Sequence, residues 1–116
     1  MSYIIVGLKN RNLPSSAENL SGNGTNSKAW DAFGDILDEA LLNHQEILGS
    51  IKNDEWIYQN VYSFIALDDE EFNISMNVIN SWISTLLHPT EWQKWGAKVW
   101  TDIVVPLMIK DHRYAQ

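Results

Sequence analysis

Residues 28–48 constrain the fold most strongly, because their apolar side chains recur at the spacing of an α-helix. Ser27 is a suitable N-cap for this helix, and Gly49 is a suitable residue to end it. An amphipathic helix gains most of its stability by packing its apolar face against another element, so the chain must supply a second layer. The positions on that face are Trp30, Phe33, Leu37, Ala40, Leu41, His44, Ile47 and Leu48.

Short runs of β-branched and aromatic residues predict that the second layer is a sheet. Residues 3–8 and 56–66 are apolar on both faces, which is typical of buried strands. Residues 72–78 alternate apolar and polar side chains, so we expect a half-buried strand that forms a hairpin with 56–66. The same residues also fit a helical stripe that begins at Asp68, with Glu71 completing a variant capping box, and this alternative stays open.

The remaining segments complete the predicted domain. Residues 10–27 are rich in Asn, Ser and Gly, which indicates a long flexible loop. Thr90 begins a capping box for a C-terminal helix that Pro106 ends or kinks, and the residues from Lys110 on are expected to form a tail. We therefore predict one α+β domain over residues 1–116, with C-terminal helices packed on a small, mainly antiparallel sheet. A mostly α-helical fold is the alternative.

Composition indicates a folded, cytoplasmic protein. The chain has no cysteine, which excludes disulfide bonds and thiolate catalysis and fits a reducing compartment. No apolar run approaches the roughly 20 residues that span a bilayer. The apolar N-terminus lacks the basic flank and the small-residue cleavage site of a signal peptide. We expect no contact with a membrane.

Negative charge is concentrated in the middle of the chain. Between Ala29 and Gln93 there are twelve carboxylates and one cation, Lys52, and the whole chain carries a formal charge of −7. A field of this sign attracts basic surfaces and repels phosphate backbones. The expected partner is therefore a basic protein, and no binding of nucleic acid is expected.

Two groups of carboxylates are the predicted partner-binding residues. One forms a stripe on the helix 28–48, and the other lies at the tip of the predicted hairpin. Trp100 is added because it lies off the main apolar face of its helix, so we expect it to be exposed, and tryptophan often anchors interfaces. The predicted partner-binding residues are Asp31, Asp35, Asp38, Glu39, Asp68, Asp69, Glu70, Glu71 and Trp100.

No pattern in the sequence indicates catalysis, a metal site or a cofactor. The histidines at positions 44, 88 and 112 have no histidine partner three or four residues away, so a zinc signature is missing. The acidic runs lack the alternating spacing of a calcium-binding loop, and no G-x-S-x-G motif occurs. We expect a protein that is not an enzyme.

These features favour a small, acidic, protein-binding inhibitor. An immunity protein or antitoxin that neutralises a basic toxin, such as a nuclease, would have this composition. One alternative is a phage-encoded inhibitor that mimics the charge of nucleic acid. The other is a structural or assembly subunit that uses the Trp-rich C-terminal third as an interface.

Overall fold

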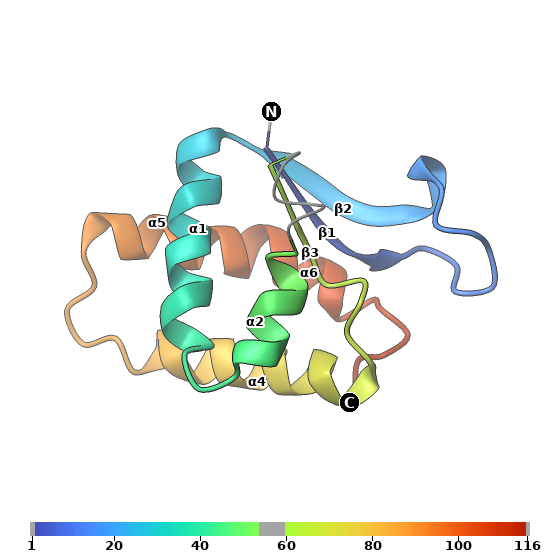
Figure 1. Ribbon diagram of the computed structural model, residues 1–116. Coiled ribbons are helices and arrows are strands. Elements are labelled where there is room, and N and C mark those ends of the chain that lie inside the picture. The colour runs from blue at the N-terminus through green and yellow to red at the C-terminus, as the bar shows by residue number, and fades with distance from the viewer. Residues whose placement is uncertain (1, 54–59, 116) are drawn as a thin grey trace.

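The computed structural model describes residues 2–53 and 60–115 and confirms the predicted α+β class. Its sheet has the order β2-β1-β3, with β1 (Ser2–Leu8) in the centre (Figure 1). β2 (Leu20–Thr25) pairs antiparallel with β1, whereas β3 (Val61–Ser63) pairs parallel with it. The sheet is therefore mixed. The parallel pairing is possible because the connection between β2 and β3 is long and contains helices.

The segment predicted as a loop, residues 10–27, contains a strand and a short 3-10 helix. η1 (Ala17–Asn19) leads directly into β2. The Asn19 amide donates hydrogen bonds to the carbonyl oxygens of Asn10, Leu13 and Pro14 at 2.9 to 3.2 Å, which fixes the turn before β2. The Gly- and Asn-rich composition indicated a loop, but pairing with β1 determines the structure of this edge strand.

The predicted helix 28–48 is two helices. α1 (Ser27–Ala40) begins at Asn26, whose side-chain oxygen accepts from the Ala29 N–H at 2.8 Å, so Asn26 and not Ser27 is the N-cap. α2 (Gln45–Ile51) follows after a turn and contains Gly49. Both helices bury apolar residues, and the helical spacing of these residues continues across the turn. The sequence pattern therefore did not indicate the break between α1 and α2.

The predicted strand 72–78 is wrong, and the helical alternative is confirmed. α4 (Asp69–Ser84) starts with a complete capping box in which Asp68 accepts from the Glu71 N–H and Glu71 accepts from the Asp68 N–H. Phe72, Met76 and Ile79 are buried at helical spacing on its inner face. The apolar–polar alternation over seven residues was also compatible with this helical period.

The predicted strand 56–66 is confirmed only in part. Within the described residues it comprises Val61–Ser63, and Phe64 leaves the strand after one further backbone hydrogen bond to Ile5, at 2.9 Å. Residues 56–59 of this prediction lie outside the described residues.

The C-terminal helices follow the predicted capping box. α5 (Glu91–Val99) begins at Thr90, as predicted, and continues into the π-helical segment η2 (Trp100–Val104) and α6 (Val105–Met108). Pro106 therefore does not end the helix. The wider π turn before it accommodates a residue that has no N–H and whose ring crowds the preceding turn.

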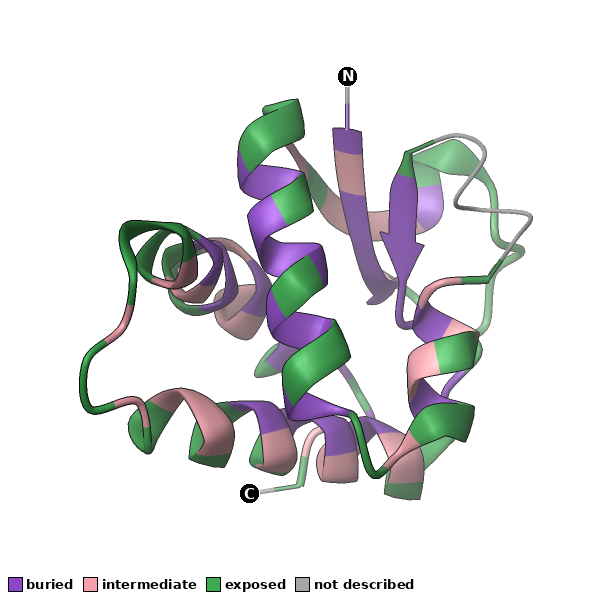
Figure 2. Ribbon diagram, turned by 60° about the vertical axis from the view of Figure 1, so that its left-hand side comes forward, coloured by how far each residue is buried: buried purple, intermediate pink, exposed green. Residues whose placement is uncertain are grey.

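The helices enclose one core with the sheet, and α4 runs across the C-terminal end of α1 (Figure 1). Exposed and buried residues alternate along α1, which buries one side and leaves the other open to solvent (Figure 2). The residues after Lys110, predicted as a tail, instead include the buried side chains of Asp111 and Arg113.

Candidate partner-binding surface

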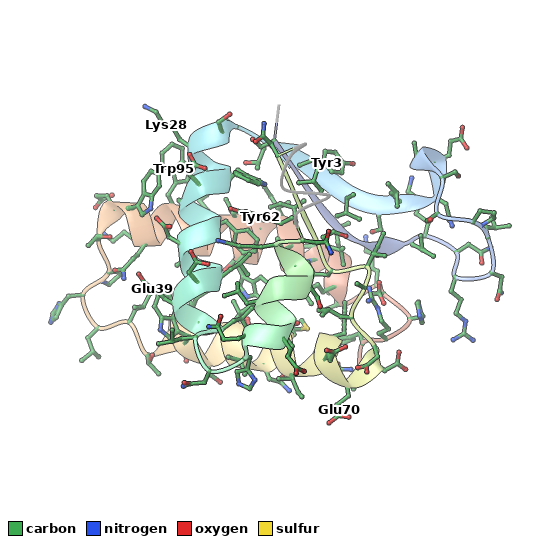
Figure 3. The ribbon with its side chains drawn as sticks, viewed as in Figure 1. Tyr3, Lys28, Glu39, Tyr62, Glu70 and Trp95 are labelled. Atoms are coloured by element: carbon green, nitrogen blue, oxygen red, sulfur yellow. The ribbon has the colours of Figure 1, made fainter. Side chains whose placement is uncertain are left out.

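The four predicted acidic residues of α1 are all exposed. Asp31, Asp35 and Asp38 are spaced by four and three residues, so their carboxylates lie one above another along the helix. Glu39 follows Asp35 by four residues and lies on the side of α1 toward α5, with Tyr62 on the other side (Figure 3). We call these four residues the α1 acidic stripe.

Two members of the α1 acidic stripe have partners within the protein. Asp38 forms an ion pair with Lys52 at 2.7 Å, which links α1 to the end of α2. Asp35 accepts a hydrogen bond from the indole Nε1 of Trp92 at 2.7 Å. Within residues 2–53 and 60–115, no Lys or Arg pairs with Asp31 or Glu39. Their charge is available to a partner.

The aspartates of the α1 acidic stripe act on Tyr62, whose hydroxyl lies against Gly34 of α1. Burial, followed by the charges of Asp31, Asp38 and Asp35, raises the pKa of the Tyr62 hydroxyl well above its usual value. The Tyr62 ring stacks on Trp30 with 4.0 Å between centroids. A Cβ on Gly34 would collide with the Tyr62 hydroxyl, which explains a glycine in the middle of α1.

Two exposed tryptophans lie beside the α1 acidic stripe. Trp92 and Trp95 of α5 are 38% and 37% exposed, and their rings meet edge to face at 6.0 Å. Because Trp92 is bonded to Asp35, the aromatic pair and the stripe form one continuous surface. Trp100 was the only tryptophan of this region among the predicted partner-binding residues, so this pair was missed.

Trp100 is buried, contrary to the sequence prediction. Only 1% of it is exposed, its ring lies 6.2 Å from Phe33, and its Nε1 donates to Asn80 at 2.7 Å. The inner face of the helix is formed by Gly96, Val99 and Trp100, so Trp100 lies on the apolar face and not off it. The spacing i, i+3, i+4 of these three residues was the signal that would have identified it.

The second acidic group, Asp68 to Glu71, lies at the first turn of α4 and not at a hairpin tip. Asp68 and Glu71 are engaged in the capping box. Acidic residues at a helix N-terminus are stabilised by the helix dipole. Stabilisation of α4 is therefore sufficient to explain why some of these acidic residues are present. Figure 3 shows Glu70, at the start of α4, well apart from Glu39 of the α1 acidic stripe, so the two acidic groups do not form one surface.

The described residues offer no constellation for metal binding. Among residues 2–53 and 60–115, no three His, Cys, Asp or Glu side chains are grouped so that they could hold an ion. In the same part of the chain, no helix has the length and apolar character required to cross a membrane.

Comparison with known proteins does not extend this description. The chain matches no protein-family model, no curated protein and no solved structure.

Proposed function

We propose that this protein is a small inhibitor that binds a basic protein through the α1 acidic stripe and the adjoining Trp92–Trp95 pair. An immunity protein or antitoxin that neutralises a toxin such as a nuclease would act in this way. A phage-encoded inhibitor that mimics nucleic acid would use the same chemistry.

The observation that carries the proposal is the hydrogen bond between Trp92 and Asp35. It joins an exposed aromatic pair to a row of exposed carboxylates, and it fixes the orientation of the indole ring. Interfaces commonly combine aromatic anchors with charged residues at their edge. This surface has both features side by side.

The two parts would contribute differently to binding. Carboxylates that face a basic surface raise the rate of encounter, and this effect weakens as salt is added. Buried aromatic anchors mainly slow dissociation. In a nuclease, the carboxylates of the stripe would occupy positions that phosphates take in the substrate complex, and the site would be blocked.

The test uses a charge change that leaves the known contacts intact. Asp31→Asn with Glu39→Gln removes two charges from residues without an ion pair among the described residues. The partners to test are any basic domains encoded next to this chain, and the rescue of cells from the toxicity of such a domain is the first readout. The association rate at low salt should fall by about tenfold, and its salt dependence should flatten.

The matched control removes two exposed charges elsewhere, with Glu18→Gln and Glu46→Gln. The association rate of this control should stay within about twofold of the unaltered protein. If the control slows association as much as the stripe variant, the effect comes from net charge and the proposed surface is wrong. If no basic domain encoded next to this chain binds the protein, the proposed function is wrong.

An assembly subunit is the second candidate, and one observation favours it. Leu87 is 86% exposed, and the preceding Leu86 lines a hollow of about 410 Å³. The lining is apolar at Ile83, Leu86, Pro89 and Ala97 and polar at Lys94, Lys98, Thr101 and Asp102. Exposed apolar surface of this kind is frequent at contacts between subunits. Sedimentation over a range of concentrations distinguishes the two functions, because an inhibitor that acts alone remains monomeric.

A further inference from the structure

A small hollow lies between α1 and the start of α5, at the centre of the proposed surface. Its volume is about 220 Å³. This exceeds the roughly 30 Å³ that one water molecule occupies and is below the about 300 Å³ at which pockets for drug-sized ligands begin. The hollow therefore matches a single amino-acid side chain.

The lining of the hollow combines apolar, aromatic and acidic groups with the two polar residues of the α5 capping box. Ala32 and Ile36 are buried residues of α1 and form its floor, while Asp35 and Glu39 contribute two carboxylates. Trp92 closes the side formed by α5, and its only donor, Nε1, is already bonded to Asp35. The indole can therefore offer an occupant only its ring.

We infer that this hollow receives one arginine side chain of the basic partner. The inference rests on the proposed function and specifies what the partner must present. A guanidinium group is planar and weakly hydrated, stacks on indole rings and forms paired hydrogen bonds with carboxylates. Its aliphatic stem would cover the apolar floor.

Other occupants fit the hollow less well. A metal ion would need more ligands than two carboxylates, and the described part of the chain has no group of three suitable side chains. A lysine ammonium is a compact, strongly hydrated charge that cannot bond two carboxylates in a planar fork. An anion would be repelled by Asp35 and Glu39.

The experiment is a titration of the full ¹⁵N-labelled chain, followed through the indole N–H resonance of Trp92. The probe is N-acetyl-arginine methylamide, and the corresponding citrulline and lysine derivatives are the comparison ligands. Citrulline has nearly the shape of arginine without its charge. The arginine probe should produce a saturable shift with a dissociation constant on the order of 1 mM, as expected for so small a ligand. Lysine should bind several-fold more weakly, and citrulline should produce no saturable shift.

Two variants assign the binding to the hollow. Glu39→Gln removes one lining carboxylate and should weaken arginine binding by about fivefold. Glu46→Gln removes an exposed carboxylate that does not line the hollow and should leave it unchanged. Equal shifts with arginine and citrulline, no saturable shift with arginine, or equal effects of the two variants would overturn the inference.

The outcome is separable from that of the proposed function, because the titration needs no partner. If the partner binds through the α1 acidic stripe but the arginine probe does not bind, only the inference about the hollow fails. If the probe binds and no basic protein is inhibited, the hollow is an arginine site and the proposed function fails.

Discussion

The guanidinium group of Arg113 is the centre of a buried hydrogen-bond network. Its Nη1 donates to the carbonyl oxygens of Phe64 and Leu67, each at 2.8 Å. Its Nη2 donates to the Val6 carbonyl at 2.8 Å. Nε and Nη2 also form a paired interaction with the Asp111 carboxylate at 2.8 and 2.9 Å. All five N–H groups of the guanidinium are therefore used, which ties the C-terminal segment to β1 and to the segment after β3.

Arg113 also controls the ionisation of Asp111. Burial alone would raise the pKa of the Asp111 carboxyl, but the hydrogen bonds and the charge of Arg113 outweigh burial and hold this pKa below its usual value. Because the folded-state pKa is lowered, the stabilisation is fully present above about pH 4, the unfolded value. It is lost as the pH falls through the folded-state pKa.

Arg113→Met should therefore destabilise the protein by about 3 to 5 kcal/mol at neutral pH, because it leaves a buried carboxylate without its partner. Below about pH 4 the difference from the unaltered protein should shrink, since Asp111 takes up a proton more readily in the variant. Chemical denaturation at several pH values measures both effects. The control is Arg11→Met, an exposed arginine whose removal should change stability by less than about 0.5 kcal/mol. A loss for Arg113→Met as small as this would mean that the buried network contributes little.

Sequence reasoning could not identify this network. Arg113 is one of a few charged residues in a short terminal segment, and such segments are usually exposed. The residues from Lys110 on were therefore predicted to form a tail. Its three carbonyl acceptors come from residues 46 to 107 positions away in the chain. Only the folded backbone brings these oxygens together.

Among the helices and strands, the capping boxes were predicted correctly. The type of one element and the buried face of another were predicted wrongly. The capping box at Thr90 was correct, and the one at Asp68 identified the true start of α4. Both errors came from the spacing of the apolar residues. Residues 72–78 fit the spacing of a strand as well as that of a helix. In the C-terminal helix, the buried face was assigned so that Trp100 was expected to be exposed. β2 was missed because its strand structure comes from pairing with β1 and not from its own composition.

The contact between α1 and α5 explains why the candidate surface exists. α5 approaches α1 closely at Gly96, where an added Cβ would lie 2.5 Å from the Ala32 carbonyl oxygen and 2.6 Å from the Ile36 side chain. This approach places Trp92 within hydrogen-bonding distance of Asp35. The sequence of either helix alone predicts neither that the two helices pack together nor the distance between them.

Gly96→Ala should push α5 away from α1. We expect a loss of about 1 to 3 kcal/mol from overpacking, in spite of the roughly 1 kcal/mol by which alanine favours a helix over glycine. The indole N–H resonance of Trp92 should shift as its bond to Asp35 lengthens. Gly49→Ala in α2 is the matched control, because an added Cβ there meets nothing within 4 Å, and it should stabilise by about 0.4 to 1 kcal/mol. An unchanged Trp92 resonance in Gly96→Ala would show that the close approach does not position the surface.

For the molecule as a whole, the sequence shows the net negative charge but not where the acidic side chains lie on the folded surface. The excess of acid over base is a property of the sequence, but whether the acids converge depends on the fold. The two predicted acidic groups lie on separate surfaces, the α1 acidic stripe and the first turn of α4. Part of each has an internal role, since Asp38 pairs with Lys52 and Asp68 caps a helix.

The same charge distribution leads to the expectation that this protein does not bind nucleic acid. The strongest local feature against this expectation is Trp95, which lines a hollow together with Lys94, Lys98 and Glu91. Stacked bases and neutralised phosphates are how single strands are bound. However, Lys94 is already paired with Glu91 at 3.2 Å, and the chain as a whole carries −7.

Gel-shift assays with single-stranded DNA, duplex DNA and RNA should therefore show no retardation at about 0.15 M salt. Lowering the salt strengthens both the attraction of the lysines and the repulsion by the acids, and the larger number of acids should keep binding weak there too. A variant with Lys94→Gln and Lys98→Gln is the control for any residual binding at low salt. Tight retardation that is lost in this variant would place a nucleic-acid site at Trp95, and the acidic stripe would then be a solvated face on a protein of another class.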